Sequence, residues 1–564
     1  MFVTLDIEND LDGNVLDIGT YWQENGEENY KVVGSWESWW AWYYRIALND
    51  PEKRVVYAHN GGGWDWLSLA QFLIESDEKE NRMLTAVCAG SNMVVLNVRV
   101  KGKFTIHFCD SLQLLRSSLD KLAGYFFGTK KVDTKGKLPH QLKIDDPETY
   151  YEYLKNDCKL LHDVLEEALR LLKDNVVDLD SFGYTIGSTA MKVFRELKND
   201  DTEIKIPWDD KQKAFLRSAY AGGRIECFKP GYYPKVKVYD INSLYPSVML
   251  SQSVPVSDRL FFTDCYGDGL GVYKCSYNQR RRDLPPVLVV DGLGSYANKG
   301  VFFSVELDLL REVDPDAEII VEEGYQFLDT EKLFTDYVEK LFALRMRDKQ
   351  GPLGLLCKFL LNSLYGKFGQ KSLREQLVMV ESVDDLYSLI TSDAGIECTP
   401  LSECIYAVQK EVHCEHEHVG IAGVITSSAR ASLYRGMLAC GFDNLIYVDT
   451  DSVHTSGAFP SNLVGDSLGL WKLEFEGEGV YAGKKLYALR DKKGKEKIRC
   501  KGVSVGGSNG ASLSFDDLCR VAGGAEIECN FLRPATPKEV FKGKQSCKFL
   551  NRKRTIRKTA ICQT

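Results

Sequence analysis

The chain has 564 residues, of which 44% are hydrophobic and 27% are charged, and its formal net charge is −9. This length favours several domains over one hydrophobic core, and the composition is that of an ordinary globular protein. The acidic balance argues against a general nucleic-acid coat, but it is compatible with a nucleic-acid enzyme that carries local basic patches.

No apolar run reaches membrane-spanning length, and the N-terminus has neither a basic segment nor a cleavage-like site. We therefore expect no transmembrane segment, no membrane partner and no signal peptide. The 16 cysteines form no Cys-x-x-Cys pair. That pattern favours reduced thiols in a cytosol over a disulfide framework.

The first predicted element is a strand at residues 2–8, on which Asp6 and Glu8 share one face because strand side chains alternate. A Gly-rich loop follows at Asn60-Gly61-Gly62-Gly63-Trp64-Asp65 and ends in another acid. Each fragment alone is a weak signal, since an exposed Asp-x-Glu is usually just solvated.

Asp145-Asp146-Pro147 predicts the N-cap and first turn of a helix that runs to about Leu172. Tyr153 and Asp157 lie four residues apart on it and project from the same side. Together, the strand, loop and helix supply four acids. They predict a site for two divalent ions about 3.5–4 Å apart, with Tyr153 orienting the attacking water.

A connector is predicted from Asp174 to about Pro234, followed by a strand at Val236–Tyr239 that ends in Asp240. Residues 255–330 are rich in Gly, Pro and short β-like runs, which indicates an insertion. Helical patterns return at Glu331–Lys349 and Leu353–Gly366.

The apolar run Leu445-Ile446-Tyr447-Val448 ends in Asp449-Thr450-Asp451-Ser452. Two carboxylates two residues apart at a strand end repel each other unless a cation lies between them. With Asp240 at the end of another strand, they predict a divalent-metal site built from two neighbouring strands, which is the arrangement that phosphoryl transfer needs.

Lys358, Asn362 and Tyr365 fall at i, i+4 and i+7 of a predicted helix and form one stripe. A half-buried amphipathic helix is the plain interpretation of such spacing. A core-facing stripe rarely holds Lys and Asn together, however, so we favour a surface that meets nucleotide phosphates. Arg345, Arg347 and Lys349 on the preceding helix either reach phosphate or form a solvated face.

Three further clusters of charged or metal-binding residues lie elsewhere in the sequence. From Lys538 to Lys558 there are nine Lys or Arg residues and one acid, which either form a solvated tail or grip a duplex. The run Arg280-Arg281-Arg282 contacts DNA or a protein partner, or is simply solvated. Zinc binding is conceivable for a Cys/His cluster, but its spacing fits no common zinc finger and a loop with incidental histidines is favoured. The cluster comprises Cys398, Cys404, His413, Cys414, His416 and His418.

The three N-terminal fragments, in their order, resemble the exonuclease motifs of proofreading DNA polymerases. These fragments are Asp6-Ile7-Glu8, Asn60…Asp65 and Tyr153-x-x-x-Asp157. Asp110-Ser111-Leu112-Gln113-Leu114-Leu115 resembles the Ser-Leu element that holds single-stranded DNA in such sites. Trp64 departs from the usual Phe or Tyr but keeps an aromatic ring.

The rest of the chain resembles family B DNA polymerases, again with motifs in the family's order. Asp240-Ile241-Asn242-Ser243-Leu244-Tyr245-Pro246 is similar to motif A, the segment Lys358–Gly366 to motif B, and Tyr447–Ser452 to motif C. Further similarities are Tyr220-Ala221-Gly222-Gly223 to the Tyr-x-Gly-Gly motif, Ile425–Arg430 to the helix before motif C, and Lys485-Leu486-Tyr487 to the Lys-x-Tyr motif.

The resemblance implies roles for individual residues. The catalytic residues for synthesis would be Asp240, Asp449 and Asp451, and those of the exonuclease Asp6, Glu8, Asp65, Tyr153 and Asp157. Two Mg²⁺ ions per active site, with Mn²⁺ able to substitute, would be held by Asp6, Glu8, Asp65, Asp157, Asp240, Ile241 and Asp451. Nucleotide would contact Tyr245, Lys358, Asn362 and Tyr365, with Tyr245 excluding a 2′-hydroxyl. DNA would contact Asn60, Ser111, Leu112, Tyr220, Gly222, Gly223, Thr426, Arg430, Lys485 and Tyr487.

Short length and two candidate insertions resemble the protein-primed branch found in phages, adenoviruses and linear plasmids. The implied fold is α+β and multidomain, with an RNase H-like 3′→5′ exonuclease domain before a right-hand polymerase. The expected parts are exonuclease 1–180, connector 181–234, palm 235–254 and 421–500, first insertion 255–330, fingers 331–370, second insertion 371–420 and thumb 501–564.

In that branch the insertions contact a terminal protein, wrap the template and displace the non-template strand. The implied partners are primer-template DNA, deoxynucleotides, the terminal protein and a single-stranded-DNA-binding protein. We expect a monomer in the cytoplasm of a host cell. An RNA- or DNA-primed repair polymerase is the alternative enzyme, and a catalytically inactive DNA-binding scaffold is disfavoured by the intact acids.

Overall fold

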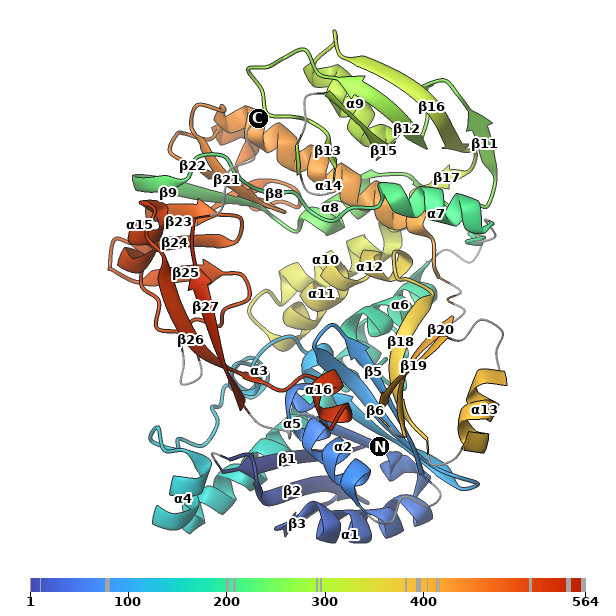
Figure 1. The fold of residues 1–564 in the computed structure, drawn as a ribbon, viewed down its shortest axis with the longest axis vertical. Helices are drawn as coiled ribbons and strands as arrows, with labels where there is room; N and C mark the ends of the chain where they lie inside the picture. The colour runs from blue at the N-terminus through green and yellow to red at the C-terminus, as the bar shows by residue number, and fades with distance from the viewer. Residues whose placement is uncertain are drawn as a thin grey trace.

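The computed structural model describes residues 2–558 apart from 11, 77–81, 199–201, 206–208, 291–292, 295–296, 381–382, 392–396, 403, 412–413, 415, 507–509 and 544–548. Figure 1 shows the N-terminal sheet at one end of the molecule and the small sheet of the first predicted insertion at the other, with helices between them. No helix in the described part combines the length and apolarity that crossing a bilayer requires. All described cysteines are free thiols.

The N-terminal part forms a mixed sheet with helices on both faces. Its elements are β1 (Val3–Asn9), β2 (Val15–Glu24), β3 (Glu27–Val33), α1 (Trp36–Asn49), η1 (Pro51–Arg54), β4 (Val55–Ala58), η2 (Gly61–Gly63), α2 (Asp65–Glu75), β5 (Arg82–Ala89), β6 (Asn92–Val100), β7 (Phe104–Asp110), η3 (Ser111–Gln113), α3 (Leu119–Phe127), α4 (Pro139–Asp145) and α5 (Pro147–Asn175). β4 runs parallel to both β1 and β7, and the other described pairs are antiparallel.

The alternation of β1 sets the two faces of this sheet. Leu5 and Ile7 are buried in a core shared with Trp39 and Trp66. Asp6 and Glu8 therefore face the opposite side, where α5 packs against β1 and β2. Asp146 caps α5 as predicted, and the helix runs three residues beyond the expected end.

A second, seven-stranded antiparallel sheet has the order β25-β24-β23-β9-β22-β21-β8. The strands are β8 (Ile225–Cys227), β9 (Gly231–Ile241), β21 (Leu445–Asp449), β22 (Ser452–Thr455), β23 (Trp471–Gly483), β24 (Leu486–Asp491) and β25 (Glu496–Cys500). The sheet thus starts inside the segment expected to be a connector, because β8 pairs with β21 at its edge. The long helix α14 (Val419–Cys440), which is buried on nearly every side, packs against it.

Helices fill the middle of the molecule in Figure 1. They are α6 (Ile186–Leu197), α7 (Asp210–Ala219), α8 (Leu244–Ser251), α10 (Thr335–Arg347), α11 (Pro352–Ser363) and α12 (Tyr365–Phe368). The short helix η4 (Ser461–Leu463) follows β22 in the chain. The two predicted helical patterns are confirmed as α10 and α11, which pack against each other, although the second helix ends at Ser363 and Tyr365 begins α12. α11 also contacts α5, so this pair lies against the N-terminal part.

The first predicted insertion folds as a four-stranded antiparallel sheet with one helix and two two-stranded pairs. Its elements are β10 (Val254–Pro255), β11 (Leu260–Thr263), β12 (Gly271–Asn278), β13 (Val289–Val290), β14 (Leu293–Gly294), β15 (Ala297–Phe303), α9 (Ser304–Val313), β16 (Glu318–Phe327) and β17 (Thr330–Glu331). The four-stranded sheet has the order β11-β16-β12-β15, and the two-stranded pairs are β10-β17 and β13-β14. The arginine run is largely neutralised within this unit. Arg280 pairs with Glu318 at 2.5 Å, and Arg281 pairs with Asp283 at 2.6 Å.

The second predicted insertion extends the N-terminal sheet. It contains β18 (Leu373–Met379), α13 (Val383–Thr391), β19 (Glu397–Ser402) and β20 (Ile405–Glu411), and β18 pairs antiparallel with β5. The N-terminal sheet therefore has ten strands, in the order β19-β20-β18-β5-β6-β7-β4-β1-β2-β3. His413 of the Cys/His cluster lies outside the described residues. Among the described residues the cluster forms no metal-binding group.

The C-terminal part returns to the N-terminal sheet (Figure 1). It comprises α15 (Phe515–Ala522), β26 (Ile527–Pro534), α16 (Pro537–Phe541) and β27 (Phe549–Ile556). α16 packs on α2, and Lys538 pairs with Glu375 of β18 at 2.6 Å. Within the basic run, Arg552 pairs with Glu539 and Lys553 with Glu528. These ion pairs neutralise part of the run's positive charge.

Candidate active sites

Asp240 lies on β9, and Asp451 lies in the turn that leads into the adjacent strand β22 of the seven-stranded sheet. Ser452, the first residue of β22, is directly opposite Asp240 on β9. The backbone N–H of Ile241 donates a hydrogen bond of 2.8 Å to the carbonyl oxygen of Asp451. Asp451 occupies the tight turn between β21 and β22, in which Thr450 has a φ of +62°. The structure thus brings together the two acids that the sequence assigned to neighbouring strands.

Burial dominates the electrostatics of this pair. It raises the pKa of Asp240 to about 7, and the carboxylates of Asp451 and Glu474 add to the rise. Lys497 and Lys358 oppose it. Burial also raises the pKa of Asp451. The charged forms of these acids are therefore disfavoured unless further positive charge approaches.

Asp449, the other acid of the turn, has its own cation. Lys485 Nζ lies 2.6 Å from Asp449 Oδ1, and the Tyr447 hydroxyl donates to Asp449 Oδ2 at 3.4 Å. Lys485 is thereby held beside the acid turn, where its predicted contact with primer stays a prediction. Tyr487 is only 6% exposed and packs on Tyr447 with ring centroids 5.0 Å apart.

The predicted nucleotide-contacting residues border the same turn. Lys358 and Asn362 are exposed on α11, whereas the other faces of this helix are buried. Tyr365 stacks on Tyr245 of α8 with ring centroids 4.2 Å apart and an interplanar angle of 17°. The exposed Lys and Asn disfavour a core-facing stripe. On α10, Arg345 Nη1 donates to Ser243 Oγ at 2.6 Å and is only half-buried.

The second acid site combines three elements of the N-terminal part. Asp6 and Glu8 come from β1, Asp65 begins α2, and Tyr153 and Asp157 lie on α5. Each acid of the set acts electrostatically on at least one of the others, so the structure gathers them as predicted. We call this set of four acids the N-terminal acid site, and Asp240, Asp449, Asp451 and Glu474 the central acid site.

Three acids of the N-terminal site are buried, Asp6 is half-buried, and the four repel one another. Burial and the Asp157 carboxylate raise the pKa of Glu8 to about 8. Burial raises the pKa of Asp65 to about 7. For Asp6, burial and Glu8 raise the pKa well above its ordinary value. Four such groups are most stable as carboxylates when cations lie among them.

The donor chemistry of this site fits divalent cations. Asp65 Oδ1 and Asp157 Oδ1 are buried oxygens with no hydrogen-bond partner, which is costly unless another group satisfies them. Carboxylate oxygens are the ligands that Mg²⁺ prefers. Within the described ranges, no group of three or more His, Cys, Asp or Glu side chains is already arranged to hold a metal ion. Ion binding would therefore draw these carboxylates closer together.

Two charged residues of the sites were missed from the sequence. Lys131, between α3 and α4, forms an ion pair with Asp157 and lies over the Tyr153 ring at 5.2 Å. Burial would lower the pKa of Lys131, but Asp157 and Asp6 outweigh it and the pKa is raised. Glu474 lies at a register shift of β23 opposite β9, where strand alternation gives no guide. Neither residue has a local pattern that could have identified it.

Several predicted DNA contacts are already engaged with protein. Ser111 is fully buried and donates to the carbonyl oxygen of Ala58 at 3.2 Å. Thr426 is 2% exposed and donates to the Gly423 carbonyl oxygen within its own helix at 3.2 Å. Arg430 is 7% exposed. A contact with DNA by these side chains needs rearrangement, and their assigned role stays a prediction.

The remaining predicted DNA contacts lie in loops. Asn60 has a φ of +65° and precedes η2, and Leu112 is half-buried in η3. Tyr220 packs closely against Gly369. A Cβ added to that glycine would lie only 2.7 Å from the Tyr220 hydroxyl oxygen. Gly222 and Gly223 follow in the segment between α7 and β8.

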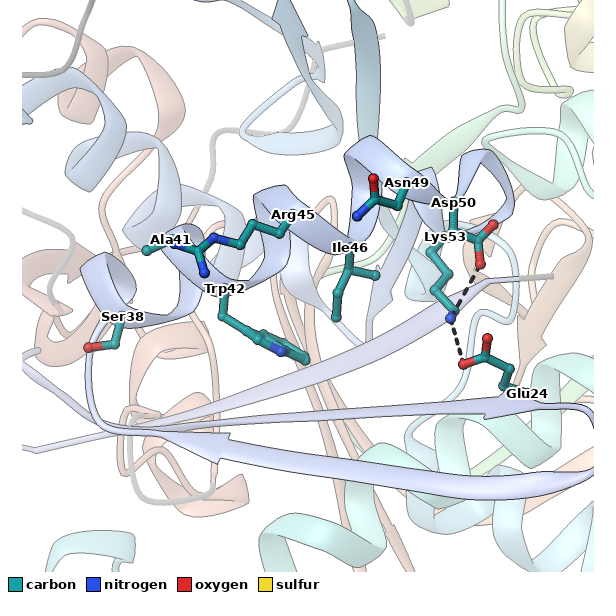
Figure 2. Close-up of a pocket in the computed structure, with 9 residues that line it drawn as sticks. All are labelled: Glu24, Ser38, Ala41, Trp42, Arg45, Ile46, Asn49, Asp50 and Lys53. Atoms are coloured by element: carbon teal, nitrogen blue, oxygen red, sulfur yellow. Dashed lines mark hydrogen bonds and ion pairs between the residues drawn. The ribbon is translucent and has the colours of Figure 1, made fainter.

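Two cavities lie apart from the acid sites. A hollow of about 690 Å³ lies between α1 and β2. In it Lys53 is paired with Glu24 and Asp50, as the dashed lines of Figure 2 show. None of the predicted site residues lines it. A cavity of about 820 Å³ lies between β5, β6, α6 and β18, and four basic residues contribute to its lining. They are Lys367, Lys371, Arg374 and Lys538.

Comparison with known proteins gives relatives along most of the chain. The family model for "DNA polymerase type B, organellar and viral" matches residues 145–411. The DNA-directed DNA polymerase of Enterobacteria phage PRD1 is 27% identical over 482 residues, covering 82% of this chain and 78% of that protein. The DNA polymerase of Bacillus phage M2 is 23% identical over 499 residues, with 80% of each chain covered. A probable DNA polymerase of Podospora anserina is 26% identical, and the match spans 42% of its length.

Solved structures match the fold from end to end. Phi29 DNA polymerase complexed with primer-template DNA and incoming nucleotides superposes with a TM-score of 0.75 at 19% identity, covering 99% of this chain and 100% of that one. Its complex with primer-template DNA alone gives a TM-score of 0.73 at 20% identity. The multidomain α+β fold expected from the motifs is therefore confirmed.

Proposed function

We propose that this chain, which is related to the organellar and viral type B DNA polymerases, is a DNA-directed DNA polymerase with a separate 3′→5′ exonuclease site. The observation that carries the proposal is the approach of Asp240 and Asp451, where Ser452 pairs with Asp240 and the Ile241 N–H donates to the Asp451 carbonyl oxygen, near the exposed Lys358. The phage relatives that match over most of their length are themselves named DNA polymerases.

In the central acid site, Asp240, Asp451 and the Ile241 carbonyl would hold Mg²⁺, for which Mn²⁺ could substitute. Bound divalent ions activate a primer 3′-hydroxyl and neutralise a nucleoside triphosphate. Lys358 adds positive charge on the side from which nucleotide enters. The stacked Tyr245–Tyr365 pair supplies a flat, rigid wall for the sugar, against which a 2′-hydroxyl would clash.

In the N-terminal acid site, Asp6, Glu8, Asp65 and Asp157 would hold the ions that hydrolysis needs. Tyr153 lies among them and would orient the attacking water. Lys131 offers a positive charge to the phosphate that is cut. This chemistry removes a nucleotide from a 3′ end, whereas the central acid site would add one there.

We also propose that synthesis starts on a terminal protein and proceeds with strand displacement. The resemblance to the protein-primed branch, which includes the two candidate insertions, supports this. The first insertion would contact the terminal protein, and the basic cavity beside the second would accommodate a DNA strand. The chain would act as a monomer in a host cytoplasm, with a single-stranded-DNA-binding protein on the displaced strand.

Primer extension tests the polymerase assignment. Asp451→Ala should lose at least about a thousandfold in extension rate, because a metal-holding carboxylate stabilises transition-state charge by several kcal/mol. Asp443→Ala, an exposed acid eight residues earlier, is the matched control and should extend like the parent. Equal extension by Asp451→Ala and the parent would remove the assigned role.

Priming is tested separately. The chain is incubated with a small protein encoded beside it and one labelled deoxynucleotide, without any oligonucleotide. Labelling of that protein's hydroxyl supports protein priming. Extension of RNA or DNA primers without any such labelling favours the repair alternative.

A further inference from the structure

A buried ion pair joins the first insertion to the helix that precedes the central acid site. Glu306 lies in the first turn of α9 and Arg430 in α14, and they are 5% and 7% exposed. Arg430 Nε donates to Glu306 Oε1 at 2.9 Å, and its Nη2 donates to Oε2 at 2.8 Å. A planar guanidinium held by both carboxylate oxygens has one orientation. Glu306 therefore fixes where the remaining N–H groups of Arg430 point.

Those N–H groups reach the segment between α7 and β8. Arg430 Nη1 donates to the carbonyl oxygens of Ala221 at 2.7 Å and Gly222 at 2.9 Å. The first insertion contacts the same segment a second time, because Arg224 Nη1 donates to the Pro286 carbonyl oxygen at 2.8 Å. Arg224 is only 4% exposed. We call residues 220–224 the glycine segment.

The glycine segment in turn packs on the acid turn. The Thr450 N–H donates to the Arg224 carbonyl oxygen at 2.8 Å. A Cβ on Gly223 would lie 2.6 Å from both Cγ2 and Oγ1 of Thr450, so the Gly223 backbone lies close against the Thr450 side chain. Thr450 directly precedes Asp451. A continuous set of contacts thus leads from Glu306 to the turn that carries a predicted metal ligand.

We propose that Glu306 is a positioning residue for nucleotide incorporation, which acts through Arg430 and the glycine segment on the Thr450–Asp451 turn. The inference rests on the proposed polymerase function and adds a residue of the first insertion to it. Glu306 touches neither the acids nor the predicted nucleotide site, and its role is to hold the guanidinium that holds the segment. Chemistry that depends on the place of one carboxylate is sensitive to shifts well below the size of an atom.

The chain contains a matched control for this ion pair. Glu312 and Arg435 also join α9 to α14, at 2.6 Å, but their side chains are 53% and 51% exposed. Arg435 makes its described hydrogen bonds to Glu312 alone. Glu306→Gln and Glu312→Gln therefore remove one charge from the same pair of helices, and only the first removes it from the path to the glycine segment. Gln retains one acceptor oxygen, which limits the cost of leaving Arg430 buried.

The experiment compares the parent, Glu306→Gln, Glu306→Asp and Glu312→Gln as full chains. It measures kcat and KM for single-nucleotide incorporation, exonuclease rate on single-stranded DNA, and amide hydrogen exchange in the glycine segment. We expect Glu306→Gln to lower kcat by about tenfold with KM and the exonuclease rate within twofold, and to speed exchange in the segment. Glu306→Asp should recover part of kcat, and Glu312→Gln should match the parent.

Two results would overturn the inference. One is that amide hydrogen exchange in the glycine segment of Glu306→Gln equals that of the parent. This result would count against the inference whether or not the parent is active. The other is a parallel loss of incorporation and exonuclease rates, since general destabilisation affects both sites. A parent that extends no primer contradicts the proposed function, and the exchange comparison between Glu306→Gln and Glu312→Gln still decides whether Glu306 holds the segment.

Discussion

Lys131 forms an ion pair with Asp157, and it does so from a loop that no sequence pattern connects to the N-terminal acid site. The pair places one positive charge among four acids, three of them buried, whose pKa values are raised. One ammonium cannot balance four carboxylates. This deficit is the physical reason to expect divalent cations at that site.

The two acid sites should be separable by mutation, because they lie in different sheets. Asp6→Ala combined with Asp65→Ala should abolish removal of a mismatched 3′ nucleotide and leave extension of a matched primer within about twofold. The measurement follows both reactions on labelled primers. Asp12→Ala, an exposed acid in the turn after β1, serves as the control. Loss of extension in the double variant would mean that the sites are not independent.

Nucleotide incorporation should depend on pH through Asp240. Because its pKa is raised to about 7, this carboxyl binds a proton as the pH falls below neutrality and then loses the charge that a cation needs. We expect the rate to fall between about pH 8 and about pH 6. Since a metal ion competes with the proton, raising the Mg²⁺ concentration should move the midpoint to lower pH. If the pH midpoint does not change with Mg²⁺ concentration, the titration belongs to a group other than Asp240.

Gly223→Ala should slow incorporation by disturbing the acid turn. The added Cβ would lie 2.6 Å from Thr450 side-chain atoms, so the turn has to shift. Thr450 has a φ of +62°, which glycine adopts without strain. Thr450→Gly in the same chain removes the clash and should restore much of the rate. Failure of this second change to restore any activity would show that Gly223 acts in another way.

Local features were predictable where chemistry and periodicity coincide. Asp146-Pro147 opened α5 as expected, and the alternation of β1 placed Asp6 and Glu8 on the face that α5 covers. The turn that holds Asp451 was found because two acids at the end of an apolar strand have no packing explanation. In each case the signal lies within a few residues of the side chain concerned.

Long-range features were not predictable. β18 pairs with β5 although nearly three hundred residues separate them, and nothing in either strand specifies its partner. Lys131 and Glu474 lie in a loop and at a register shift, where periodicity carries no information. Ser111 donates to the carbonyl oxygen of Ala58, 53 residues earlier in the chain. Motif resemblance located Ser111 but could not reveal this partner.

The central claim is that Asp240 and Asp451 share divalent ions, and Mn²⁺ titration followed by electron paramagnetic resonance tests it most directly. The background is Asp6→Ala with Asp65→Ala, which removes the N-terminal site. There, Asp240→Asn and Asp451→Asn should each abolish the same bound Mn²⁺, and the two together should remove no more than either alone. Full Mn²⁺ binding in either single variant would contradict the account.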